Sequence, residues 1–412
     1  MRLLKWTYAA LALLMLQSCL SGSYEGVAND FFDQGEKVPV EVEVGDPSGG
    51  ILHRQDSQTK GSGPIDNIMQ VEGKDIYVYA FRNDMFTSYA KTSAKDNINT
   101  LVDGSIDRKG SLAGKKAKTT GSMYLDWAES ATSLYYHSSD MKHVPYEFYA
   151  YYLDGLQVQD SDYTRTDDAV TIKVQIDGRS DLMSAKAELL EQQLENCPEE
   201  EREYAREYTY SYFTAIRNIH PRFYFKHHLA RFEFELMPGY AQGESQEVHV
   251  VSVKVYSKYK AEFVVAEKSH PSQLGLRFED EYACFTLTEP DGSPIPENKY
   301  LVSTVSSSGA ASTPIPIGGG LLLAPQNEAL VALVKLREKR SDGKVYEFEN
   351  KVNITYDNPG ESNMFAAGNK YKVKFPIYGV TNVSANVTLE KWAEGGNLNV
   401  DAEKDKPNLT NN

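Results

Sequence analysis

The second half of this 412-residue chain is dominated by short stretches in which apolar and polar side chains alternate. Alternation with a period of two places the apolar side chains on one face of a β-strand. Turn-forming residues separate these stretches, and the chain contains 27 tyrosines, a residue type that favours strands. The predicted strands of this half cover 223–229, 232–236, 247–256, 282–287, 329–336, 344–354, 371–377 and 383–389. Many short strands without a repeating unit predict an all-β fold built of sandwiches.

The first half adds further strands and a small helical insertion. Residues 75–81 and 145–152 are rich in aromatic and β-branched side chains and predict strands. Between residues 181 and 196, apolar residues recur near helical spacing, which predicts a helix. Pro198 and the three glutamates after it are typical of a first helical turn, so we expect a second helix that ends near Phe213.

The alternation shifts by one residue in the middle of the chain. Phe223, Phe225, His227 and Leu229 share one face, but the apolar pattern resumes at Phe232. Such a shift predicts a β-bulge near Ala230-Arg231.

The first 19 residues have the pattern of a secretory signal that ends at a cysteine. Arg2 and Lys5 precede an apolar run over residues 6–16, which is too short for a permanent membrane-spanning helix. Cleavage before Cys19 would allow acylation of its thiol and tether the mature chain to a membrane. An ordinary signal peptide with an incidental cysteine is the alternative. We therefore expect a lipoprotein signal peptide at 1–18 and a flexible tether at 19–36.

Charge and cysteine content exclude several classes of function. The formal net charge of −15 argues against nucleic acid as a partner, because an acidic surface repels phosphates. With Cys19 acylated, only Cys197 and Cys284 remain, too few for a disulfide framework or a zinc site. We expect both to be unpaired thiols, although a single bridge between them is conceivable.

No arrangement of polar residues predicts a catalytic or metal site. His227 and His228 are adjacent, so a strand directs them to opposite faces, and we expect His227 to be a hydrogen-bonded core residue rather than a ligand beside His220. The acidic pairs Asp160/Asp162 and Asp167-Asp168 fall in turn-like segments. The sequence has no nucleophile elbow, no H-E-x-x-H motif and no phosphate-binding loop with its lysine. We expect neither an enzyme nor a cofactor.

Residues 37–44 predict a half-buried strand directly after the tether. Its apolar positions are Val38, Val40, Val42 and Val44. Pro39 cannot donate a hydrogen bond to a neighbouring strand, which favours the edge of a sheet. The polar loop that follows, residues 45–63, contains Arg54 and Lys60, where proteases could cut.

Loss of this strand would leave a sheet with unpaired backbone groups and an apolar groove. An extended strand from another molecule could fill the groove through main-chain hydrogen bonds and alternating side chains. Candidate donors close the chain, because residues 383–389 alternate and the short stretch Leu398-Asn-Val400 follows Trp392. This would assemble a polymer without any cofactor.

Six short motifs occur in order along the chain. They are the signal ending at Cys19, Ile76-Tyr-Val-Tyr-Ala-Phe81, Phe148-Tyr-Ala-Tyr-Tyr152, Asp181-Leu-Met-Ser-Ala185, His227-His-Leu-Ala-Arg-Phe232, and Ala367-Gly-Asn-Lys-Tyr371 with Trp392. Together they resemble the bacterial fimbrillin family, whose members build type V pili. The resemblance implies two transthyretin-like β-sandwich domains, which we place at 37–217, including the helical insertion, and at 218–412.

The resemblance also implies a route of maturation. It implies lipidation of Cys19, cleavage by an arginine-specific protease after Arg54 and removal of the strand at 37–44. Lys60 or another protease is the alternative. The donor strand would come from the segment 383–400 of a neighbouring subunit, with Val383, Ala385, Val387 and Leu389 as its apolar residues.

We therefore expect a structural subunit of a cell-surface fimbria that takes part in adhesion and travels as an outer-membrane lipoprotein. Its partners would be other copies of itself or related pilus subunits, the outer membrane through the lipid, and a ligand on a host or bacterial surface. A lipid-anchored anchor or tip subunit is one alternative. Another is a glycan-binding surface lipoprotein in which Tyr149, Tyr151 and Tyr152 stack on sugars. Packing of these tyrosines inside a sheet is the interpretation we prefer.

Overall fold

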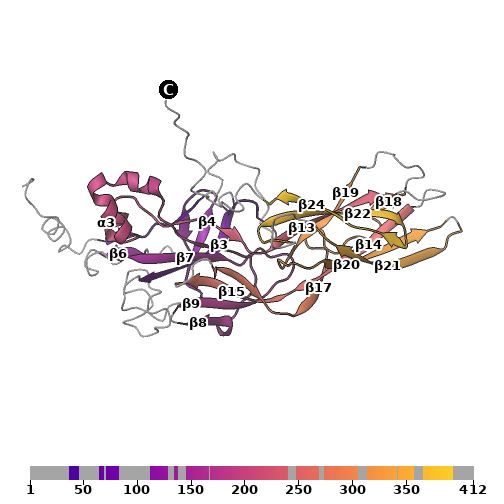
Figure 1. Ribbon diagram of the computed structural model, residues 1–412, viewed down its shortest axis with the longest axis horizontal. Helices are drawn as coiled ribbons and strands as arrows, with labels where there is room; N and C mark the ends of the chain where they lie inside the picture. The colour runs from indigo at the N-terminus through magenta and orange to yellow at the C-terminus, as the bar shows by residue number, and fades with distance from the viewer. Residues whose placement is uncertain are drawn as a thin grey trace, which may run out of the picture.

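The structure, a computed structural model, describes most of the chain. The described residues are 37–45, 65–68, 71–82, 112–128, 134–137, 145–166, 168–239, 247–268, 273–304, 313–340, 342–356 and 365–392. Cys19, Arg54, Lys60 and residues 393–412 lie outside them. The molecule is elongated and built mainly of β-strands (Figure 1), as the alternation predicts. Among the described residues, no helix is both long and apolar enough to cross a membrane.

A six-stranded antiparallel sheet forms the centre of one end of the molecule (Figure 1). In spatial order its strands are β12 (Lys226–His227), β10 (Met183–Lys186), β7 (Tyr146–Tyr152), β3 (Glu72–Arg82), β4 (Lys115–Thr120) and β5 (Leu125–Trp127). Six of the seven residues of β7 are buried. Successive side chains of a strand point to opposite faces of its sheet, so the burial of nearly all of them requires that both faces be covered.

A four-stranded sheet covers the first face. Its strands are β16 (Gly275–Phe278), β15 (Lys260–Glu267), β9 (Ala169–Gln175) and β8 (Tyr163–Arg165). The ring of Tyr151 meets that of Phe263 edge-on at 6.2 Å, and the Tyr149 hydroxyl donates to the Glu267 carbonyl at 2.8 Å. The hairpin β15–β16 follows residue 218 in the sequence, yet it extends the sheet of β8 and β9. The sheets thus cross the predicted domain boundary.

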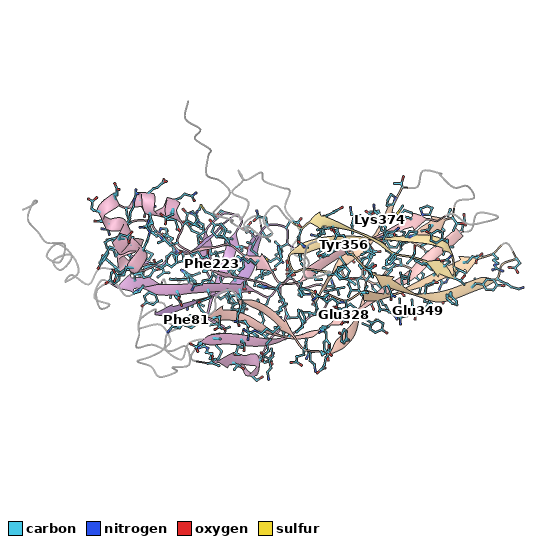
Figure 2. All side chains as sticks on the ribbon, in the orientation of Figure 1. Phe81, Phe223, Glu328, Glu349, Tyr356 and Lys374 are labelled. Carbon is cyan, nitrogen blue, oxygen red and sulfur yellow. The ribbon has the colours of Figure 1, made fainter. Side chains whose placement is uncertain are left out.

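The second face is covered by the start of the chain and by the segment that contains the helices. The short strands here are β1 (Lys37–Pro39), β2 (Glu43–Val44), β6 (Tyr135–His137) and β11 (Arg222–Phe223). The helical turns are η3 (Glu191–Asn196), η4 (Glu199–Glu201), α3 (Arg202–Glu207) and α4 (Tyr212–Ala215), while η2 (Asp160–Asp162) precedes β8. Their buried residues form an apolar cluster with this face of the sheet. Phe223 and Phe81, labelled in Figure 2, belong to the clusters on the two faces.

The helical insertion is shorter and more interrupted than the sequence predicts. The expected helix over 181–196 is wrong in its first half, because Met183–Lys186 form β10 between β7 and β12. Apolar residues near helical spacing occur there since both faces of the sheet are buried, which removes the period of two. The second predicted helix is interrupted at Tyr210, whose φ of 54° lies in the left-handed region.

Two five-stranded sheets form the other end of the molecule and share one apolar core (Figure 1). The first contains β19 (Ile315–Leu323), β13 (Ala230–Pro238), β22 (Asn369–Gly379), β23 (Asn382–Val383) and β24 (Asn386–Lys391). The second contains β17 (Tyr282–Thr286), β14 (Glu247–Lys258), β18 (Leu301–Ser303), β20 (Leu330–Lys339) and β21 (Val345–Ile354). Buried and half-buried residues alternate along β13 and β20, as the sequence predicts.

The phase shift in the middle of the chain has a different cause from the one predicted. Leu229 and Ala230 are both fully buried because the chain leaves β12 in the six-stranded sheet and enters β13 in another sheet. The bulge lies further on, where Phe232 pairs with Leu321 but Phe234 pairs with Ile317. The extra residues belong to the glycine stretch of β19, where Gly320 has a φ of 85°.

Candidate functional site

The N-terminal segment, residues 37–45, packs on the second face of the six-stranded sheet. It is not one continuous strand, because β1 pairs antiparallel with β6 whereas β2 pairs parallel with β11. Between the two strands, the Val40 amide donates to the Leu134 carbonyl at 2.8 Å. We call the elements that surround residues 37–45 the seat: β5, β6, β11 and the second face of the sheet.

The second part of the segment is hydrogen-bonded on both sides. Towards β11, the amides of Glu43 and Gly45 donate to the carbonyls of Pro221 and Phe223 at 2.9 and 2.8 Å. Towards β5, the Val44 amide donates to the Met123 carbonyl at 2.6 Å, and the Leu125 amide donates to the Val42 carbonyl at 3.1 Å. The predicted edge position is therefore wrong for residues 42–45. Pro39, which motivated it, lies in β1, where β6 is the single strand partner among the described residues.

Three of the four predicted valines fill the seat. Val40, Val42 and Val44 are 2%, 1% and 0% exposed, while Val38 is half-buried. They join the apolar cluster of the second face, to which Phe148 and Phe223 also belong. The alternation of residues 37–44 thus identifies the buried side chains correctly at its last three apolar positions.

The seat also contains an ion pair that the alternation does not predict. Glu43 is on the polar side of the segment, yet it is 5% exposed. Its Oε2 accepts from Arg222 Nε at 2.7 Å and lies 2.7 Å from Nη2 of the same guanidinium. Burial has the largest single effect on the pKa of Arg222 and lowers it, but the hydrogen bond to Glu43 and the charge of Glu43, together with smaller contributions from Tyr224, outweigh burial and hold this pKa above its ordinary value. Glu41, by contrast, is exposed, and its Oε2 lies 3.5 Å from Nε2 of His220.

Tyr224 closes the end of the seat. Gly45 lies directly beneath the ring of this tyrosine, and a Cβ built on Gly45 would clash with three ring atoms. A residue with a side chain at this position therefore requires the ring to move. Arg222 thus contacts the segment at Glu43, and Tyr224 contacts it two residues further on, at Gly45.

A second polar cluster lies where the two ends of the molecule meet. Asp181, which is fully buried, accepts from Nδ1 of His227 at 2.9 Å, and the His227 ring stacks on that of Trp392 at 4.1 Å. This confirms His227 as a hydrogen-bonded core residue. His228 pairs separately with Ser184, whose Oγ lies 2.7 Å from its Nε2. Across the residues that the structure describes, no three histidine, cysteine or acidic side chains are grouped to hold a metal ion.

His228 gives the stability of the protein a dependence on pH. Burial lowers the pKa of this histidine to about 3, with smaller contributions from the charges of His227 and Lys226. The unfolded chain, with a histidine pKa of about 6.5, therefore binds more protons than the folded chain between about pH 6.5 and pH 3.

The contribution of His228 to the free energy of unfolding should therefore be fully present above pH 6.5 and should decrease as the pH falls below this value. We expect the free energy of unfolding by urea to decrease by up to about 2 kcal/mol between pH 7 and pH 5 because of His228. The variant His228→Gln, which retains a donor towards Ser184, should lack this part of the slope. A wild-type protein that gains stability on acidification would contradict the assignment.

The predicted donor strand is part of its own sheet. Val387 pairs with Val373 and Leu389 with Tyr371 across β24 and β22. Val383, Ala385 and Val387 pack against the core as half-buried residues, while Leu389 is 37% exposed. β24 pairs with β22 alone among the described strands, so its other side is an edge.

Other predicted features have clear positions. Cys197 is buried, Cys284 is exposed, and both are free thiols, as expected. Tyr149, Tyr151 and Tyr152 are 0%, 0% and 2% exposed. Stacking of these tyrosines on sugars is therefore wrong, and their packing inside the sheet is confirmed. Glu43, Arg222 and Tyr224 escaped the sequence analysis because their pairing joins distant parts of the chain.

Comparison with known proteins places the chain among related sequences. The sequence model described as "Fimbrillin-like" matches residues 72–392. No curated protein sequence matches. Solved structures to which the chain is similar include a candidate cell adhesion protein from Bacteroides uniformis, with 14% identity, a TM-score of 0.39 and coverage of 86% of this chain and 99% of that one.

Two structures from Porphyromonas gingivalis also match over most of their length. The fimbrial anchor protein Mfa2 has 10% identity, a TM-score of 0.28 and coverage of 87% of this chain and 99% of that one. The tip fimbrial protein Mfa3 has 8% identity, a TM-score of 0.26 and coverage of 87% and 100%.

Proposed function

Because the chain belongs to the fimbrillin-like family, we propose that it is a structural subunit of a cell-surface fimbria and polymerises by donor-strand exchange. In this proposal, proteolysis after Arg54 frees the N-terminal segment, which leaves the seat. The strand of a neighbouring subunit then enters the seat and joins the two molecules. Assembly requires neither a cofactor nor an enzymatic activity of the subunit itself.

The observation that carries the proposal is the seat itself. The N-terminal segment supplies three buried valines and backbone hydrogen bonds on both sides of residues 42–45. It enters the fold from one end of the chain, so its departure breaks no connection between other strands. The groove that it would leave is apolar and lined by unpaired backbone donors and acceptors, which an extended strand can satisfy.

The donor would be the C-terminal part of a second subunit, in the segment around residues 383–400. The first portion of this range pairs with β22 in its own sheet and would have to leave it. A division into two transthyretin-like halves near residue 218, with the hairpin β15–β16 of the second half joined to a sheet of the first, belongs to the same proposal.

Export would precede assembly. Lipidation of Cys19 would hold the precursor at the outer membrane, with residues 19–36 as a tether, until cleavage releases it into the fimbria. A subunit that kept its lipid would serve instead as an anchor.

N-terminal sequencing of the protein recovered from sheared cell-surface fibres tests the proposal. We expect most molecules to begin at Gln55, since cleavage after Arg54 must precede polymerisation. A variant Arg54→Ala should remain cell-associated and unpolymerised, whereas Lys60→Ala should assemble normally. Fibres composed of intact chains that begin at acylated Cys19 would contradict strand removal and favour the anchor role.

A further inference from the structure

We infer that Arg222 selects the strand that replaces the N-terminal segment, because it requires a carboxylate at the position now held by Glu43. We further infer that residues 398–402 of a second copy meet this requirement. The inference rests on the proposed strand exchange and identifies the segment that takes part in it.

The seat fixes the register of whatever strand occupies it. The carbonyls of Pro221 and Phe223 accept from the amides of Glu43 and Gly45, and the Met123 carbonyl accepts from the amide between them. A strand that runs in the same direction and reproduces these hydrogen bonds must place one side chain beside Arg222. The Glu43 side chain now at this place is 7% exposed and that of Arg222 is 26% exposed, so the incoming strand would cover the guanidinium again.

The two candidate donor segments differ at this position. We align each donor so that its three apolar residues take the places of Val40, Val42 and Val44. The donor residue between the second and third apolar residues then takes the place of Glu43, beside Arg222. For residues 385–389 that residue is Thr388, which carries no charge. For residues 398–402, in which Leu398, Val400 and Ala402 are apolar, it is Asp401. Residues 385–389 are in addition already engaged, since most of them form β24 and pair with β22.

Charge complementarity decides between the two segments. A carboxylate beside Arg222 restores the ion pair, whereas threonine would leave the covered guanidinium without a counter-charge. Removal of one partner from a covered charge pair weakens binding strongly, and here, where Arg222 keeps some contact with water, we expect about tenfold to hundredfold.

Tyr224 adds a second, weaker preference to the same register. Residue 403 of the donor falls where Gly45 now lies, and in this chain it is glutamate. The ring of Tyr224 must move to admit that side chain. Glycine at position 403 should therefore bind more tightly than the natural residue.

Strand exchange with synthetic peptides tests the inference. The full mature chain is nicked between residues 45 and 65, and fluorescent peptides of residues 396–404 then compete with the nicked segment. Binding is measured by anisotropy, and release of the segment by mass spectrometry. We expect the natural peptide to bind about tenfold to hundredfold more tightly than its Asp401→Asn form and than a peptide of residues 383–391. Glu403→Gln, which removes the same charge two residues away, is the matched control and should bind at least as well as the natural peptide.

The variant Arg222→Gln completes a double-mutant cycle. With this chain, the natural and Asp401→Asn peptides should bind equally, and thermal melting verifies that the variant folds. In the reversed pair, Arg222→Glu should prefer the Asp401→Lys peptide. Equal binding of the natural and Asp401→Asn peptides to the unmodified chain, or tighter binding of the 383–391 peptide, would overturn the inference and leave strand exchange intact. If no peptide, including one of residues 37–45, displaces the segment, the proposed function fails and the inference with it.

Discussion

A chain that begins at residue 46 should be much less stable than the full chain. Val40, Val42 and Val44 are almost completely buried, and burial of a valine side chain contributes roughly 1.5–3 kcal/mol. Loss of the three should therefore lower the free energy of unfolding by roughly 5–9 kcal/mol. This is comparable to the entire stability of an ordinary domain, about 5–15 kcal/mol. Chemical denaturation followed by tryptophan fluorescence measures the difference.

A peptide of residues 37–45 added in excess should restore much of that stability, because binding to the folded state alone stabilises it. The control is a peptide in which the three valines are replaced by serine, which keeps the backbone hydrogen bonds but not the apolar burial. A truncated chain that unfolds at the same denaturant concentration as the full chain would show that the segment is not an integral part of the fold. The strand-exchange proposal would then lose its physical basis.

The substitution Tyr151→Ala should destabilise the protein by about 3–5 kcal/mol, the range seen when a large buried aromatic side chain is removed from a core. Tyr151 is fully buried and stacks between Tyr77 and Tyr79, with ring centroids 5.2 and 5.9 Å away. Its hydroxyl donates to the Ala113 carbonyl at 2.8 Å. The substitution removes these contacts and leaves a cavity between the six-stranded and four-stranded sheets.

Tyr282→Ala is the matched control. Tyr282 is 49% exposed, so its removal should change the free energy of unfolding by no more than about 0.5 kcal/mol. Urea denaturation of both variants at pH 7 measures the contrast. If Tyr151→Ala were as stable as the wild type and lost affinity for a polysaccharide, the packing interpretation of the tyrosines would be wrong.

Much of the fold follows from local patterns in the sequence. The period of two along β13, β20 and β22 predicts both the strands and their buried faces, because each such strand has its apolar face on one core. The same reasoning fails where a strand is covered on both faces. Met183–Lys186 lie in such a sheet, so their apolar residues lose the period of two and resemble a helix instead.

The period of two also predicted part of the candidate site. The valines of the N-terminal segment alternate, and their burial is a consequence of that alternation. The location of the segment between β5 and β11 could not be predicted, since the carbonyls of Pro221, Phe223 and Met123, which accept its hydrogen bonds, belong to parts of the chain far from residues 42–45.

The sequence by itself determined the all-β class, the family and the apolar residues of the N-terminal segment, because each of these depends on patterns within a few neighbouring residues. Only the tertiary structure decided that Glu43 is buried, since its partner Arg222 lies 179 residues further along the chain. It likewise decided that β15 and β16 join strands from the first half of the chain. Pairings of this kind depend on how complete sheets stack, and no local pattern of residues encodes them.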